Sequence, residues 1–135
     1  NNDPGCEIIF ETISNLPTSN FKVIPSMRFN YFSKLLQCSS ALLGNSSTGV
    51  REAPFLGIPS LDVGTRQTNR SYAESVTWSD ARDDEKISTF LKEEWGKEYP
   101  SDHSFGAGNS SQKFNEIINS KTIWNLPIQK NFHEK

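Results

Sequence analysis

The middle of the chain carries hydroxyls, a carboxylate and a guanidinium in an order suited to binding an anion. Ser46, Ser47 and Thr48 follow an apolar run and precede a helical pattern, so they are predicted to lie where a helix begins. Backbone N–H groups at a helix start lack intrahelical partners, and the helix dipole is positive there, which favours phosphate. Glu52 follows within two helical turns, and Arg66 lies beyond the next predicted strand. Together these groups predict a sugar-nucleotide site.

Each of these groups also has an ordinary structural explanation. Any helix can begin with a serine N-cap, and Glu52 can be a solvated helix residue or a partner for Arg51. Glu52 lies four residues after Thr48, which on one helix places both side chains on the same face. A carboxylate there can accept two hydrogen bonds from a ribose diol, and an arginine suits bidentate phosphate contact. Arg66 is favoured for that contact, and Arg70 is interpreted as a surface charge.

The elements that must position these groups alternate between helices and strands. Apolar periodicity predicts helices over residues 6–15, 29–38 and 48–56, one beginning at the acidic run 83–85 and one after 111, and strands over 21–24, 41–43, 58–63 and 75–78. The run 41–43 is continuously apolar, which is typical of a strand buried on both faces. Pro54 falls inside the central helix, so that helix either begins later than residue 48 or kinks, and Gly57 is its expected C-terminal cap.

Alternating strands and helices joined by short loops predict an α/β fold, with a Rossmann-like parallel sheet and helices on both faces. Ligands of such sheets bind beyond the carboxyl ends of the strands. The turns at residues 44–49 and 64–70 both follow predicted strands, so they are expected at that same edge.

Composition limits the classes of function. The chain has 135 residues, enough for one domain, and its net charge of -2 provides no basic field for nucleic acid. No apolar run approaches the roughly 18 residues that span a membrane, and no signal-peptide pattern is present, so a cytoplasmic location without a membrane partner is expected. Cys6 and Cys38 form no framework, and buried free thiols are favoured over a disulfide. No metal site and no cofactor are predicted.

The central motif resembles the UDP-N-acetylglucosamine 2-epimerase family. The segment Gly44-Asn-Ser-Ser-Thr-Gly-Val-Arg-Glu-Ala-Pro-Phe-Leu-Gly-Ile-Pro and the later Gly64-Thr-Arg-Gln-x-x-Arg70 carry the resemblance. Their Asn-Ser-Ser and Gly-Thr-Arg-Gln forms are similar to the hydrolysing branch, which makes N-acetylmannosamine for sialic acid synthesis. Non-hydrolysing relatives more typically have Asp-Ser-Gly-Gly and Arg-Asp-Thr-Thr-Glu-Arg. Segments 1–5, 105–111 and 126–132 match further family motifs in order, with Gly-Ala-Gly at 106–108 where relatives often have Gly-Asp-Gly.

The resemblance implies a two-domain fold of the glycosyltransferase-B type, with the active site between two Rossmann-like domains. Residues 1–135 would form a partial C-terminal, UDP-binding domain, and the N-terminal domain and first strands of this one would lie in a longer parent. Ser46 and Ser47 would contact the diphosphate, Glu52 the ribose hydroxyls, and the backbone near Met27 would approach uracil. The residues that the resemblance assigns to UDP binding are Asn1, Met27, Ser46, Ser47, Glu52 and Arg66.

The implied reaction abstracts the proton at C2 of the sugar and expels UDP, giving a glycal to which water adds as C2 is reprotonated from the other face. This needs paired acid and base groups, which the family places mostly outside these residues. The fragment is therefore expected to bind UDP or a UDP-sugar without catalytic residues of its own, within a homo-oligomeric parent. The alternatives are the same chemistry on UDP-diacetylbacillosamine, a non-hydrolysing epimerase, and a non-enzymatic nucleotide-binding or interaction domain.

Overall fold

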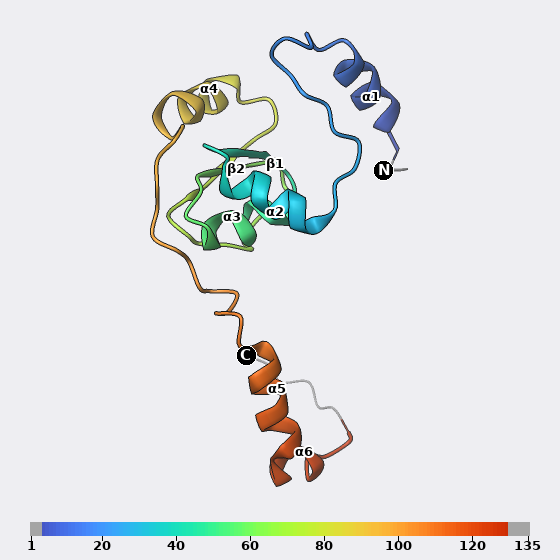
Figure 1. Cartoon of the computed structure of the whole chain (residues 1–135), viewed down its shortest axis with the longest axis vertical. Helices are drawn as coiled ribbons and strands as arrows, with labels where there is room; N and C mark the ends of the chain where they lie inside the picture. The colour runs from blue at the N-terminus through green and yellow to red at the C-terminus, as the bar shows by residue number, and fades with distance from the viewer. Residues whose placement is uncertain (1–3, 130–135) are drawn as a thin grey trace. The chain divides into compact units, whose positions relative to one another are not determined.

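The computed structural model describes residues 4–129 and divides the chain into two units, 1–38 and 39–135 (Figure 1). The first unit contains the helices α1 (Cys6–Ser14) and α2 (Phe29–Gln37). The described part of the second unit contains strands β1 (Leu42–Gly44), β2 (Ser60–Val63) and β3 (Val76–Ser79), the 3₁₀ turn η1 (Ser47–Gly49), and helices α3 (Glu52–Phe55), α4 (Asp84–Glu93), α5 (Ser110–Asn119) and α6 (Lys121–Trp124). Within residues 4–129 no helix is long and apolar enough to cross a membrane.

The first unit confirms both predicted helices and corrects two other predictions. Residues 21–24 form no strand, and the apolar side chains of this run are exposed. A strand gains stability from a hydrogen-bonded neighbour and a covered face, and this run has neither among the described residues of its unit. The cysteines are free, but Cys6 is only half-buried, and Cys38 is exposed because it lies at the C-terminal end of α2.

The described strands form one parallel sheet in the order β1-β2-β3, which confirms the α/β prediction. β2 is central, and its Ser60, Leu61 and Asp62 are buried, whereas Leu43 and Gly44 of β1 are exposed. The prediction that the 41–43 run is buried on both faces is therefore wrong. β1 is an edge strand of this sheet, so fewer elements cover it.

The predicted central helix is two short elements. η1 ends at Gly49, and α3 begins at Glu52, because the backbone of Arg51 (φ −124°, ψ −66°) is not helical. Pro54 is the third residue of α3, where an N–H has no intrahelical acceptor, so the proline costs this helix nothing. The helix thus begins later than residue 48. Thr48 and Glu52 lie on different elements, and the argument that one helix places them on the same face is wrong.

Gly57 ends α3 as predicted. Its φ of 70° is left-handed, its N–H donates to the Pro54 carbonyl (3.1 Å), and the next N–H, of Ile58, donates to Ala53 (2.9 Å). These two hydrogen bonds form a Schellman motif. The Tyr99 N–H donates to the Gly57 carbonyl (2.9 Å), so the segment after α4 packs directly against this turn.

Two of the remaining helices begin close to where the sequence predicts, α4 at Asp84 and α5 at Ser110. The Asp83 side chain caps α4 by accepting from the Lys86 N–H (2.9 Å), and α4 packs on β3 with Phe90 buried. α5 and the short α6, which was not predicted, contact each other, and Trp124 Nε1 donates to the Ile118 carbonyl (2.8 Å). No described side chain of α5 or α6 is buried.

Candidate functional site

The turn after β1 presents its hydroxyls at the surface. Ser46 has an extended backbone, and its Oγ accepts a long hydrogen bond from the Thr48 N–H (3.3 Å). The serine N-cap considered from the sequence is therefore present. Ser46 is exposed, while Ser47 and Thr48 are half-buried, so the turn is open to solvent. Because the capping bond is long, an anion at this turn would compete with a weak internal contact.

The turn after β2 lies at the same sheet edge, as predicted, because β1 and β2 are parallel. A side chain that sequence reasoning missed joins the two turns: Gln67 Nε2 donates to the Asn45 carbonyl (3.1 Å). Gln67 is 3% exposed, and its Oε1 accepts from Arg70 Nη1 (3.2 Å). The only sequence signal for Gln67 was its place in the Gly-Thr-Arg-Gln segment. The buried amide fixes the separation of the two turns.

Glu52 is the first residue of α3 and is half-buried. Its Oε2 is buried and has no hydrogen-bond partner within residues 4–129. The Glu52 carboxylate is therefore not fully solvated, in contrast to the solvated helix residue considered from the sequence. The Arg51 guanidinium lies over the Phe105 ring, 5.3 Å from its centroid. A buried carboxylate oxygen without a partner is available to accept hydrogen bonds from a ligand's hydroxyls.

Both arginines of the loop after β2 are exposed, and the phosphate role of Arg66 stays a prediction. Arg66, favoured for phosphate contact, is exposed in the loop after β2. Arg70 is exposed, as predicted, yet its guanidinium also holds Gln67. Arg70 and Arg51 line one hollow of about 210 Å³, together with Val50, Gln67 and Phe105. Two guanidiniums beside the 45–47 turn make this part of the edge electropositive.

Two of the assigned residues are not among the described residues of the second unit. Met27 belongs to the first unit, just before α2, and is half-buried. Asn1 lies outside the described residues. The roles that the resemblance gives to these two residues stay predictions. Within the described part of the chain, no group of three or more His, Cys, Asp or Glu side chains is placed to hold a metal ion.

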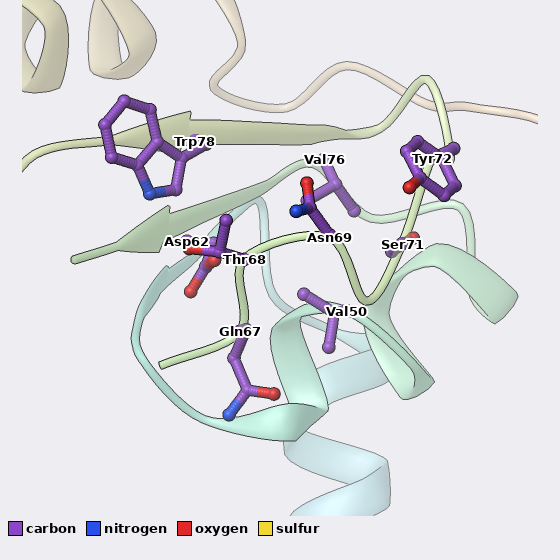
Figure 2. A pocket seen from close by; sticks show the side chains of 9 residues that line it. All are labelled: Val50, Asp62, Gln67, Thr68, Asn69, Ser71, Tyr72, Val76 and Trp78. Atoms are coloured by element: carbon purple, nitrogen blue, oxygen red, sulfur yellow. The ribbon is translucent and has the colours of Figure 1, made fainter. Parts of the chain in front are cut away.

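A larger cavity, of about 390 Å³, lies against β2 and β3 under the 64–72 loop (Figure 2). Asp62 lines it from β2 and is 3% exposed, and burial raises the pKa of its carboxyl group. Sequence reasoning missed Asp62, although it is the one charged residue in the apolar 58–63 run. The full lining comprises Val50, Asp62, Gln67, Thr68, Asn69, Ser71, Tyr72, Val76 and Trp78.

Comparison with known proteins shows the family of this chain. The family model for UDP-N-acetylglucosamine 2-epimerase matches residues 1–119 of this chain. The chain belongs to the UDP-N-acetylglucosamine 2-epimerase family. This confirms the resemblance drawn from the Gly44–Pro59 motif, and the epimerase family's α/β fold agrees with the parallel sheet observed here.

The chain is similar to three relatives with different names. The chain is 37% identical to the UDP-N-acetylglucosamine 2-epimerase of Neisseria meningitidis serogroup B, over 98% of this chain and 36% of the relative. It is 30% identical to the hydrolysing UDP-N,N'-diacetylbacillosamine 2-epimerase of Legionella pneumophila, over 91% of this chain and 32% of the relative. It is 31% identical to the polysialic acid biosynthesis protein P7 of Escherichia coli, over 56% of this chain and 20% of the relative. The chain thus spans about a third of the length of the first relatives.

Proposed function

We propose that this chain is the UDP-binding part of a hydrolysing UDP-N-acetylglucosamine 2-epimerase. The full-length parent would convert UDP-N-acetylglucosamine and water to N-acetylmannosamine and UDP. The single observation that carries the proposal is the buried, unpartnered Oε2 of Glu52 next to the solvent-open 45–47 turn, since α3 packs on η1. That pairing offers a ribose acceptor beside a phosphate-binding turn.

Each assigned residue has a distinct part in this proposal. The hydroxyls of Ser46 and Ser47, with nearby N–H groups, hold the diphosphate, and Glu52 accepts from the ribose hydroxyls. The electropositive hollow beside the turn supports phosphate binding further, because Arg51 and Arg70 both line it. Remaining contacts to UDP are assigned to Asn1, Met27 and Arg66.

The proposed chemistry takes place outside these residues. Abstraction of the C2 proton with loss of UDP gives a glycal, and water then adds at C1 as C2 is reprotonated from the other face. Those proton transfers need an acid and a base placed at the sugar. No residue of this chain is assigned to either role, so the fragment binds UDP without turnover. The Asn45-Ser46-Ser47 form of the motif supports the hydrolysing branch over the non-hydrolysing one.

The test is a calorimetric titration of the intact parent with UDP, comparing wild type with Glu52→Ala. Because a hydrogen bond to a charged group contributes about 1.5–3 kcal/mol, the variant should bind UDP at least about tenfold more weakly. The matched control is Glu98→Ala, which removes an exposed carboxylate of the same unit and should leave the affinity unchanged. Equal affinity of Glu52→Ala and wild type would refute the ribose role.

The second candidate is the same reaction on UDP-N,N'-diacetylbacillosamine, which the Legionella relative's name and its 30% identity favour. The name of the Escherichia coli relative, a polysialic acid biosynthesis protein, favours a role in sialic acid synthesis for the first candidate. Turnover of the two UDP-sugars by the intact parent, with the released products identified by mass spectrometry, separates these candidates. A product that still carries UDP would indicate the non-hydrolysing reaction instead.

A further inference from the structure

The cavity under the 64–72 loop contains a buried carboxylate with an unsatisfied oxygen (Figure 2). Asp62 is 3% exposed, and its Oδ1 has no hydrogen-bond partner among residues 4–129. A buried charge without a partner is costly, and native structures rarely keep one without a function. A donor that enters the cavity would remove that cost.

The position of Asp62 in the sheet makes the carboxylate a fixed feature. Asp62 lies in the central strand, in register with Gly44 of β1 on one side and Trp78 of β3 on the other. Val50 and Val76 contribute apolar surface to the cavity, and Thr68 of the covering loop also lines it. The sheet therefore holds the acceptor while an exposed loop covers it, which is how small-molecule sites are commonly built.

The charges of the cavity select the kind of ligand. No lysine, arginine or histidine lines it, so Asp62 is its one charged side chain. An anionic ligand would be repelled, whereas an ammonium ion would gain an ion pair in a place with little water. Outside the lining, Lys86 Nζ lies 5.3 Å from the centroid of the Trp78 ring.

We propose that this cavity binds a small organic cation whose ammonium group pairs with the Asp62 carboxylate. The oxygens of Thr68 and Asn69 can accept the remaining ammonium hydrogens, and the valines and Trp78 contact its hydrocarbon part. The volume of about 390 Å³ is near the lower end for ligand sites, which fits an amine with one ring. None of the six residues assigned to UDP lines the cavity, although Val50 and Gln67 line both this cavity and the neighbouring hollow of Arg51 and Arg70.

The test is titration of the intact parent with benzylammonium chloride and, separately, with benzyl alcohol, which has a similar shape but no charge. Benzylammonium should bind saturably, and Asp62→Asn should weaken it at least tenfold, because the variant keeps the shape and removes the charge. The affinity for benzyl alcohol should change less than twofold. Glu98→Gln, an exposed control, should change neither affinity.

A second variant and a folding control keep the result decisive. Thr68→Trp fills the cavity from the exposed loop without removing the carboxylate, and it should abolish binding of both probes. The far-ultraviolet circular dichroism spectrum of each variant reports whether the protein is folded, and it should match that of wild type. Absence of saturable binding, equal affinity for the two probes, or an unchanged affinity in Asp62→Asn would each overturn the proposal. None of these results bears on whether UDP binds.

Discussion

At the scale of single residues, three buried or half-buried polar side chains determine what this sheet edge can do. Glu52 and Asp62 each have a carboxylate oxygen without a partner in the described part of the chain, and Gln67 has both ends of its amide bonded. The unpartnered oxygens are where ligands are proposed to bind. The satisfied amide instead positions the turns, because it spans from the 64–72 loop to Asn45.

Asp62 should make the stability of the ligand-free chain depend on pH in an unusual direction. Burial raises the pKa of Asp62, so the folded state holds this proton to higher pH than the unfolded state does. Its contribution to stability therefore falls as pH rises through the folded-state pKa. Asp62→Asn should unfold at higher urea than wild type at pH 7, with no difference at about pH 3. A variant less stable than wild type at pH 7 would contradict this.

At the scale of elements, the site depends on how chain segments end. The non-helical Arg51 divides the region into η1 and α3, which places Glu52 at a helix start, separate from the element that holds Thr48. At its other end α3 is closed by the Schellman motif at Gly57. The segment after α4 covers this end, because the Asp102 N–H donates to the Pro54 carbonyl (3.0 Å).

Gly57→Ala should destabilise the chain more than Gly64→Ala does. Both glycines have positive φ, so each alanine carries a conformational cost of about 1 kcal/mol. Only at Gly57 would the new Cβ also meet a backbone atom, the Tyr99 carbonyl oxygen at 2.2 Å, whereas at Gly64 it meets nothing within 4 Å. Urea unfolding should therefore show a loss of more than 2 kcal/mol for Gly57→Ala and about 1 kcal/mol for Gly64→Ala. Equal losses would show that the Tyr99 contact is unimportant.

At the scale of the whole molecule, much apolar surface is exposed. The described helices α1, α5 and α6 bury no side chain, and Ile8, Phe114 and Trp124 on them are more than half exposed. β1 is an edge strand of the described sheet. Exposed apolar patches and unpaired strand edges are surfaces that associate with other chains or domains.

The chain alone should therefore self-associate. Light scattering after size exclusion should give a mass that rises with concentration from the 15.2 kDa of one chain. Leu43→Lys places a charge on the edge strand β1 and should lower the associated fraction, because edge lysines oppose strand pairing. A constant monomer mass over a hundredfold concentration range would contradict the prediction. The matched control is Ser88→Lys on an exposed position of α4, which should leave association unchanged.

The sequence by itself determined the features that depend on neighbouring residues. Helix periodicity predicted α1, α2 and α4, the glycine after α3 predicted the Gly57 cap, and strand-helix alternation predicted the parallel sheet. These features depend on local sterics and hydrogen bonds, which a short stretch of sequence specifies. The segment of residues 44–59 identified the family for a similar reason, since it is a contiguous string of residues.

Only the tertiary structure decided which polar groups are buried and which strands have partners. In the sequence, Asp62 is an isolated charge in a strand and Gln67 is a loop residue. In the structure both side chains are buried, and both line the cavity under the 64–72 loop. The 21–24 run has strand composition but gains no partner, and the 41–43 run has the composition of a central strand but lies at an edge. Burial and pairing depend on segments distant in sequence, so local patterns cannot specify them.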